Sequence, residues 1–123
     1  MSAVQRYAHA GSDFAAKLAQ TVAVLDQAQD QLDPLVQASS LGAEDMVLTH
    51  LLAKHRIAAD IFVLDTGKLH DSTLALLPQI EARYGRKVKV YQPDAAAAQA
   101  YEARHGSQAM YRSLALRQEC CRI

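Results

Sequence analysis

Apolar residues recur at two different spacings along the chain, and the two spacings predict an alternation of helices and strands. In the first thirty residues they fall three or four apart, which places side chains on one side of a helix. This stripe consists of Phe14, Leu18, Val22 and Leu25. Asp33-Pro34 ends the pattern, since proline disfavours helical geometry in the residue before it. The pattern therefore predicts a long helix that begins near Ser12-Asp13.

Three short runs rich in apolar residues have the length and composition of strands. They cover residues 35–38, 61–64 and 88–91. The second run has four apolar residues in succession, which suits a parallel strand buried on both faces. Helical spacing returns after each run, over residues 46–56, 74–84, 94–104 and 107–117. Pro78 should kink or restart the second of these helices, Gly85 should end it, and Ser107 should cap the last one.

This alternation predicts an α/β fold with a parallel sheet, helices on both faces and right-handed crossovers. We expect residues 1–34 to form an amino-terminal helical segment and residues 35–123 to form the α/β domain. In such sheets, ligands bind beyond the carboxyl ends of the strands. The polar turns that follow the first two strands are therefore the candidate sites.

The first of these turns is Ser39-Ser40-Leu41-Gly42-Ala43-Glu44-Asp45-Met46, here called the serine loop. Backbone N–H groups at such a strand-to-helix turn, together with the positive end of the helix dipole, bind anionic oxygen. Gly42 should let the chain turn tightly and let a phosphate approach the backbone. Ser39 and Ser40 offer hydroxyl donors. An ordinary strand-to-helix loop with a serine cap explains the same residues.

The second turn is Asp65-Thr66-Gly67-Lys68-Leu69-His70, here called the aspartate loop. The Asp65 carboxylate suits a ribose hydroxyl or a metal, and Lys68 can neutralise phosphate or sulfate charge. A tight turn with an aspartate cap is the alternative. Because both loops follow strands at one edge of the sheet, together they favour a phosphate or nucleotide site. Neither a Walker-type phosphate loop nor the three-glycine dinucleotide pattern occurs, so such a site is of another kind.

Composition narrows the function classes. The 13 basic and 13 acidic residues cancel, which argues against general nucleic-acid binding. No apolar run approaches the roughly 20 residues of a membrane span. The first residues lack the apolar core of a signal peptide, so a cytoplasmic location without a membrane partner is expected.

The only two cysteines are adjacent, Cys120-Cys121. They suit a pair of free thiols, a strained vicinal disulfide, or two ligands of a metal or cluster. Two thiolates do not complete a four-thiolate site. The sequence then stops at Ile123 without a terminating pattern, so we expect it to be the amino-terminal portion of a longer protein.

Four stretches together resemble the assimilatory adenylyl-sulfate and phosphoadenylyl-sulfate reductases. They are residues 39–48, 64–70, 110–113 and 117–123, in the order and spacing of that family. Arginine is more usual there where Lys68 stands. The resemblance implies an adenine-nucleotide alpha-hydrolase-like, Rossmann-like fold. It also implies a nucleotide-binding role for residues 35–123 and a thiol-dependent reduction of activated sulfate to sulfite, as part of sulfate assimilation and cysteine biosynthesis.

The adjacent cysteines resemble those of the family's iron–sulfur branch, whose members carry a 4Fe-4S cluster and generally prefer adenylyl sulfate. The resemblance thus implies that Cys120 and Cys121 are two of four cluster ligands. It assigns Ser39, Ser40 and Gly42 to the phosphosulfate. It assigns Asp65, Thr66 and Gly67 to the nucleoside, and Lys68, which can neutralise phosphate or sulfate charge, completes the expected substrate-binding residues.

The resemblance also implies parts that this sequence lacks. The second cysteine pair and the nucleophilic cysteine are expected beyond Ile123, so we expect the chain alone to be inactive. Thioredoxin or glutathione would be the electron donor. Homo-oligomerisation is left open. Three alternatives remain: a phosphoadenylyl-sulfate reductase, a related ATP-splitting adenylyltransferase, and a non-catalytic remnant that binds a nucleotide or a partner.

Overall fold

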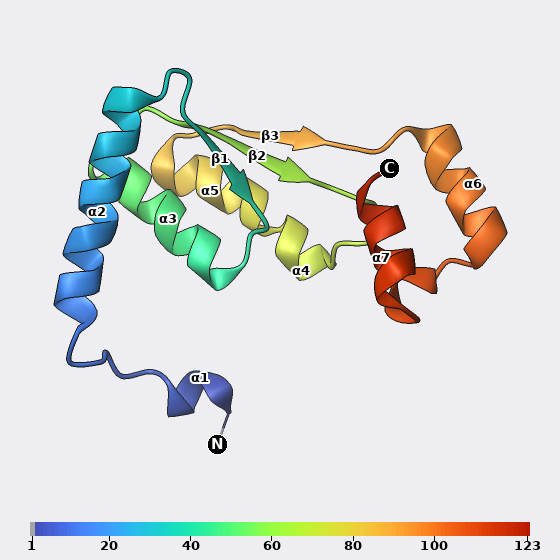
Figure 1. The fold of residues 1–123 in the computed structure, drawn as a ribbon, viewed down its shortest axis with the longest axis horizontal. Coiled ribbons are helices and arrows are strands. Elements are labelled where there is room, and N and C mark those ends of the chain that lie inside the picture. The colour runs from blue at the N-terminus through green and yellow to red at the C-terminus, as the bar shows by residue number, and fades with distance from the viewer. Residues whose placement is uncertain (1) are drawn as a thin grey trace.

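The computed structural model describes residues 2–123 and contains a parallel sheet with three strands in the order β1-β2-β3 (Figure 1). The strands are β1 (Val36–Ser39), β2 (Asp60–Leu64) and β3 (Val88–Tyr91). The helices are α1 (Ala3–Arg6), α2 (Phe14–Gln31), α3 (Ala43–Lys54), α4 (Asp71–Leu74), α5 (Leu76–Tyr84), α6 (Ala95–His105), the 3-10 helix η1 (Ala109–Tyr111) and α7 (Leu114–Cys121). The predicted parallel α/β class is confirmed.

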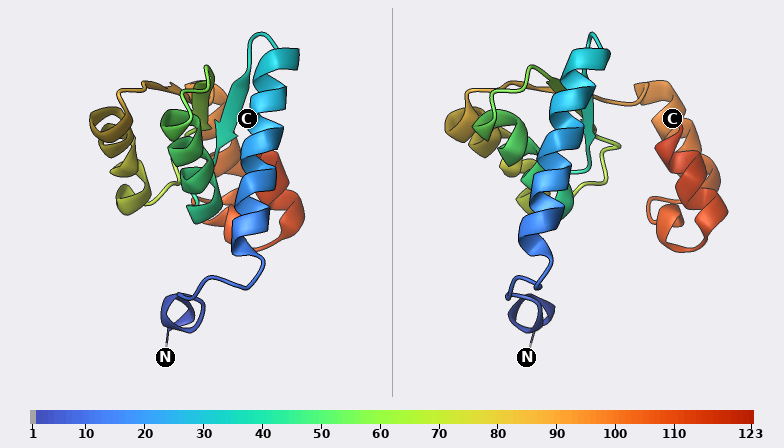
Figure 2. Two further views of the ribbon diagram at one scale, coloured as in Figure 1. Left: turned by 90° about the vertical axis from the view of Figure 1, so that its left-hand side faces the viewer. Right: turned by 60° about the vertical axis from the view of Figure 1, so that its left-hand side comes forward.

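The two faces of the sheet differ in burial. Ser39, Val63 and Val90 are aligned across the three strands, and Val63 is only 1% exposed. Val63 packs with Ile80 of α5, and Met46 of α3 lies against the same cluster. Helices α3 and α5 lie side by side on this face (Figure 2). The next residues along β2 and β3, Leu64 and Tyr91, point to the opposite face and are 55% and 47% exposed.

Most predicted helix ends agree with the structure. Gly85 ends α5 in the left-handed conformation, with φ 65°. Pro78 is the third residue of α5, where its missing N–H costs little, because the first turn of a helix leaves those groups without an internal partner. A break at Ala75 separates α4 from α5, as the predicted restart requires. Asp94 caps α6 by accepting the Ala97 N–H at 2.9 Å.

The prediction for the last helix was wrong at its start. Ser107 does not cap it; the chain first forms η1, and Ser113 caps α7 by accepting the Leu116 N–H at 3.1 Å. The reason is packing, because Ala109 and Met110 are buried against Tyr101 and the chain must turn before α7 begins. The short helix α1 was not predicted.

Helix α2 agrees with three residues of its predicted stripe, since Leu18, Val22 and Leu25 are half-buried. The prediction was wrong for Phe14, the first residue of the helix, which is 53% exposed. Gln29 of α2 accepts the Ala58 N–H at 2.8 Å and so ties the helix to the loop before β2. Helix α1 extends away from the sheet (Figure 1). Within residues 2–123, no helix combines the length and apolarity needed to cross a bilayer. The division of the chain at residue 34 stays a prediction.

Arg86 joins the segments that lead into β2. Its guanidinium donates to three backbone carbonyls, those of Leu52 at 3.1 Å, Ile57 at 2.6 Å and Ala59 at 3.2 Å. The first lies in the last turn of α3, and the others lie in the connection from α3 to β2. One side chain therefore joins the end of α3 to the segment that leads into β2, and the Leu52 carbonyl also accepts the Ile57 N–H at 2.9 Å.

Helices α6 and α7 stand beyond the carboxyl ends of β2 and β3 (Figure 1). Their contact is a small apolar cluster formed by Tyr101, Ala109, Met110 and Cys120. The Tyr101 hydroxyl donates to the Leu116 carbonyl at 2.8 Å, so this buried side chain is fully satisfied. The fold thus brings the end of α7, with both cysteines, to the edge of the sheet where the two polar loops lie.

Candidate functional site

The serine loop is closed on itself by hydrogen bonds. The Ser40 backbone N–H and hydroxyl both donate to Asp45 Oδ2 at 2.6 Å. Ser39 Oγ accepts the Leu41 N–H at 3.1 Å, and Ser40 Oγ accepts the Gly42 N–H at 3.2 Å. The bonds from Ser40 stabilise the charged carboxylate and hold the pKa of Asp45 below its ordinary value of 3.8. The loop therefore has a defined shape without a ligand.

The turn itself is made by Leu41, which corrects the prediction for Gly42. Leu41 has a positive φ of 62°, and its side chain is 5% exposed and packs against Val63 and Ile80. Gly42 has an ordinary extended backbone with φ −69°. A Cβ on Gly42 would nevertheless lie 3.1 Å from Ser40 Oγ and 3.2 Å from the Glu44 carboxylate oxygens. The glycine is therefore not needed for the turn, and a larger residue there would require the Ser40 and Glu44 side chains to shift by a few tenths of an ångström.

The loop is also anchored to β1 and α3. Gln37 Nε2 donates to the Asp45 carbonyl at 3.0 Å. Thr49 is fully buried, and its hydroxyl lies 3.0 Å from both Gln37 Oε1 and the Asp45 carbonyl. Within the described chain, no side chain caps the amino end of α3, which begins after Gly42. That helix end is thus held in place by hydrogen bonds, and the acidic residues Glu44 and Asp45 lie in its first turn.

The aspartate loop begins where β2 and β3 end together. The Asp65 N–H donates to the Tyr91 carbonyl at 2.8 Å and extends the strand pairing by one residue. Asp65 Oδ1 accepts the Gly67 N–H at 2.8 Å, and Gly67 has a φ of 80°, as an aspartate-capped turn requires. Lys68 then forms an ion pair with Glu102 of α6.

Three adjoining hollows connect these loops with the cysteines. The first, about 520 Å³, is lined by Ser39, Ser40, Thr66 and Cys121 among others. The second, about 300 Å³, is lined by Asp65, Lys68, Glu102 and Cys120 among others. The third, about 290 Å³, has Asp65, Thr66 and both cysteines in its wall. Thr66 borders all three, so the serine loop, the aspartate loop and the cysteine pair form one continuous site.

Both cysteines are free thiols, so the structure has no vicinal disulfide. Cys120 is 8% exposed and packs in the cluster with Tyr101, whereas Cys121 is exposed. Burial raises the pKa of the Cys120 thiol; Cys121 adds to this shift, and Lys68 opposes it. Among residues 2–123, no three His, Cys, Asp or Glu side chains are grouped as a metal site. Two thiols at one hollow have the donor chemistry that an iron–sulfur cluster requires, and they supply two of the four thiolate ligands.

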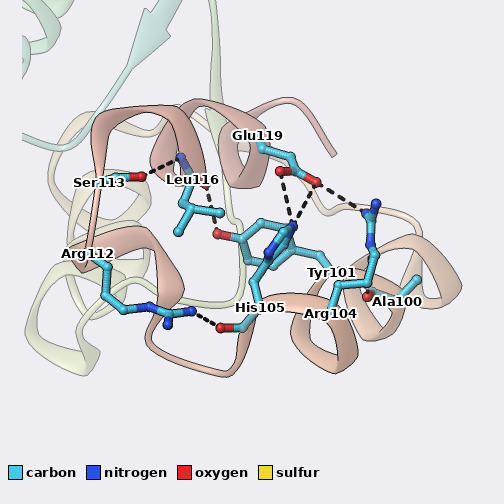
Figure 3. Close-up of polar contacts among 8 residues, drawn as sticks. All are labelled: Ala100, Tyr101, Arg104, His105, Arg112, Ser113, Leu116 and Glu119. Carbon is cyan, nitrogen blue, oxygen red and sulfur yellow. Dashed lines mark hydrogen bonds and ion pairs between the residues drawn. The ribbon is translucent and has the colours of Figure 1, made fainter.

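Polar contacts fasten the helix that carries the cysteines to α6 (Figure 3). Glu119 accepts from Arg104 Nη2 at 3.2 Å, and its two carboxylate oxygens lie 3.2 and 3.3 Å from His105 Nε2. Arg112 donates to the His105 carbonyl, and Arg117 Nε donates to the Met110 carbonyl at 3.3 Å. Both arginines thus hold the backbone of this region.

The other histidines pack or lie at the surface. His50 Nδ1 lies 3.1 Å from the Tyr84 hydroxyl, and His55 is exposed at the end of α3. His70 is exposed and precedes α4 without capping it through its side chain. It lines none of the three hollows.

Sequence reasoning missed three residues of the site. Asp45 organises the serine loop, Glu102 pairs with Lys68, and Tyr101 supports the turn of α7 that carries Cys120. Asp45 lies five residues after Ser40, and Gly42 is the N-cap of α3, so the capping-box spacing does not identify it. Glu102 and Tyr101 act across the fold, and no local pattern points to them.

Asp45 should make stability depend on pH. Because its pKa is lower in the folded chain than in the unfolded chain, its contribution is present above the ordinary value of 3.8 and is lost as pH falls through the lowered folded value. We expect Asp45→Asn to cost about 1 kcal/mol at pH 7, after allowance for partial exposure. Urea unfolding from pH 7 to pH 3 should show the difference shrinking in the acid range. Asp30→Asn, on an exposed part of α2, is the control, and an equal loss at all pH values would contradict the role of the charge.

The fold and the site define a class: an α/β protein with a polar site at the carboxyl edge of a parallel sheet. Residues 34–123 match the family model described as the phosphoadenosine phosphosulfate reductase domain. The chain belongs to this family.

Curated relatives carry the name adenosine 5'-phosphosulfate reductase. The protein from Burkholderia cepacia is 40% identical over 111 residues, which cover 90% of this chain and 44% of the relative. The protein from Allochromatium vinosum is 42% identical over 105 residues, 85% of this chain and 41% of the relative. The one from Neisseria meningitidis serogroup A is 48% identical over 87 residues, 70% of this chain and 36% of the relative. The chain thus spans less than half the length of these relatives.

Proposed function

We propose that the chain is the nucleotide-binding part of a cytoplasmic adenylyl-sulfate reductase of sulfate assimilation. The observation that carries this proposal is the convergence of the serine loop, the aspartate loop and both cysteines on one site. The printed names of the relatives support adenylyl sulfate as the substrate.

In this proposal the amino end of α3 and the backbone and hydroxyls of Ser39, Ser40 and Gly42 hold the phosphosulfate. Asp65, Thr66 and Gly67 hold the nucleoside, and Lys68 neutralises ligand charge. The closed serine loop supports this division because its backbone is already ordered on β1 and α3; in this proposal the ligand takes the place of the Asp45 carboxylate as acceptor of the Ser40 N–H and hydroxyl. In this proposal the chain binds adenylyl sulfate and orients it for reaction.

The chemistry requires a thiolate that the proposal places in the remainder of the protein, beyond Ile123. That thiolate attacks the sulfur of adenylyl sulfate; a sulfur–sulfur bond forms, and AMP leaves with the bridging oxygen. A second thiol, from thioredoxin or glutathione, attacks the protein sulfur. A disulfide forms and sulfite leaves, so two thiols are oxidised for each sulfate reduced. The chain alone should therefore bind adenylyl sulfate but not reduce it.

We also propose that Cys120 and Cys121 donate two of the four thiolates of a 4Fe-4S cluster. The free state of both thiols and their shared hollow support this role. When bound, such a cluster supplies a metal centre whose electrostatic field reaches the ligand site. This chain's own part is to hold α7, through Tyr101 and Glu119, so that the thiols border that site.

The test uses the full-length protein purified without oxygen, with thioredoxin as donor. We expect sulfite and AMP from adenylyl sulfate, turnover at least roughly tenfold below this with phosphoadenylyl sulfate, and about four iron atoms per chain. Cys121→Ser should lose iron, whereas Ser107→Ala, on the exposed loop after α6, should keep it.

Absence of sulfite would overturn the proposed reductase activity, and active protein that contains no iron would overturn the proposed cluster. Pyrophosphate released from ATP and magnesium would favour the adenylyltransferase alternative.

A further inference from the structure

The ion pair between Lys68 and Glu102 joins two parts of the chain that are distant in sequence. Lys68 lies in the aspartate loop, and Glu102 lies in the middle of α6, 34 residues later. Both side chains line the second hollow together with Asp65 and Thr66. The pair therefore borders the space that the proposed function assigns to the ligand.

Charge in this hollow is unbalanced. Among the residues of 2–123 that line it, Lys68 is the one cation, whereas Asp65 and Glu102 are both carboxylates. The Asp65 carboxylate is already committed to the Gly67 N–H at 2.8 Å. An anionic ligand that enters this space must therefore share the Lys68 ammonium with Glu102, or displace the Glu102 carboxylate from that ammonium.

The pair is suited to such an exchange. The side chains of Lys68 and Glu102 are 27% and 45% exposed, so water can solvate the carboxylate when it separates. A lysine ammonium is a compact charge on a flexible stem with three donors, and it can turn from one anion to another without moving the backbone. An arginine fork with two parallel bonds would be harder to release.

We propose that Glu102 is a positioning residue that holds the Lys68 ammonium at the hollow and gives it up to the anionic group of the incoming nucleotide. This inference rests on the proposed function, because it takes adenylyl sulfate as the ligand. An ordinary site residue strengthens ligand binding, whereas Glu102 weakens it in this proposal. The Glu102 carboxylate orders Lys68 but competes with the ligand for its ammonium.

The test is a double-mutant cycle on ligand affinity in the full-length protein, measured by titration calorimetry with adenylyl sulfate. Lys68→Gln should weaken binding about tenfold. Glu102→Gln should instead tighten binding about two- to fivefold, since it removes a partly exposed competitor. In the Lys68→Gln background, Glu102→Gln should have no effect. The tightening should shrink at high salt.

Two controls separate this role from others. Adenosine, which carries no anionic group, should bind wild type and Glu102→Gln equally. Glu81→Gln, which removes the same charge from an exposed part of α5, should leave adenylyl-sulfate affinity unchanged. If wild type binds adenylyl sulfate and Glu102→Gln binds it equally or more weakly, the exchange is wrong and Glu102 is structural. If wild type does not bind adenylyl sulfate, the proposed function and this inference both fail.

Discussion

Replacing Arg86 by methionine should lower the free energy of unfolding by about 3 kcal/mol. The substitution keeps most of the apolar stem but removes the guanidinium from the carbonyls of Leu52, Ile57 and Ala59. Hydrogen bonds to a charged donor contribute about 1.5–3 kcal/mol each. Because Arg86 is only partly buried, water can bind the freed carbonyls in the variant and recover part of this free energy. Urea unfolding followed by circular dichroism measures the change.

Two further substitutions make this result specific. Lys87→Met removes a neighbouring exposed charge and should cost less than about 0.5 kcal/mol. Arg86→Lys keeps the charge but not the planar fork, so its cost should fall between the two. A loss below about 1 kcal/mol for Arg86→Met would mean that water satisfies the Ile57 and Ala59 carbonyls equally well, since the Leu52 carbonyl keeps the Ile57 N–H as a donor.

A double substitution in the two loops, Ser40→Ala with Asp65→Ala, should weaken adenylyl-sulfate binding at least roughly tenfold. Each change removes a polar contact proposed for the ligand, worth about 1 kcal/mol. Each also removes an internal bond, from Ser40 to Asp45 or from Gly67 to Asp65, that orders a loop. Titration calorimetry with the full-length protein measures the affinity.

The matched control removes one serine and one aspartate outside the site. Ser72→Ala with Asp30→Ala changes exposed positions of α4 and α2 that line none of the three hollows. We expect wild-type affinity from it. Unchanged affinity in the loop variant, with the fold intact by circular dichroism, would show that the ligand binds elsewhere.

Local features of the chain were largely predictable from its sequence. Most of the stripe of α2, the three strands, the end of α5 at Gly85 and the start of α6 near residue 94 all follow from spacing and capping chemistry within a few residues. The position of the site followed from topology, because parallel strands bring the two loops to one edge. The part that each residue takes in ligand binding remains a prediction.

Features that depend on distant contacts were not predictable in the same way. Burial of Leu41 against Ile80 lets a leucine adopt the left-handed turn that the sequence assigned to Gly42. Packing of Met110 against Tyr101 moved the helix cap from Ser107 to Ser113. The apolar run at β2 predicted burial on both faces, yet Leu64 is 55% exposed in the described chain. In the first two cases a packing contact with another helix decides the outcome.

The buried side chain of Leu41 has a thermodynamic consequence for recognition. A leucine with φ 62° is strained by about 1–2 kcal/mol, and its contacts with Val63 and Ile80 offset that strain. The loop between the two serines and α3 is therefore ordered when the core forms, and an arriving anion loses little conformational entropy there. Anion binding and core packing are then linked through Leu41. A substitution that creates a cavity beneath Leu41 should therefore make anion binding by the serine loop slower and weaker.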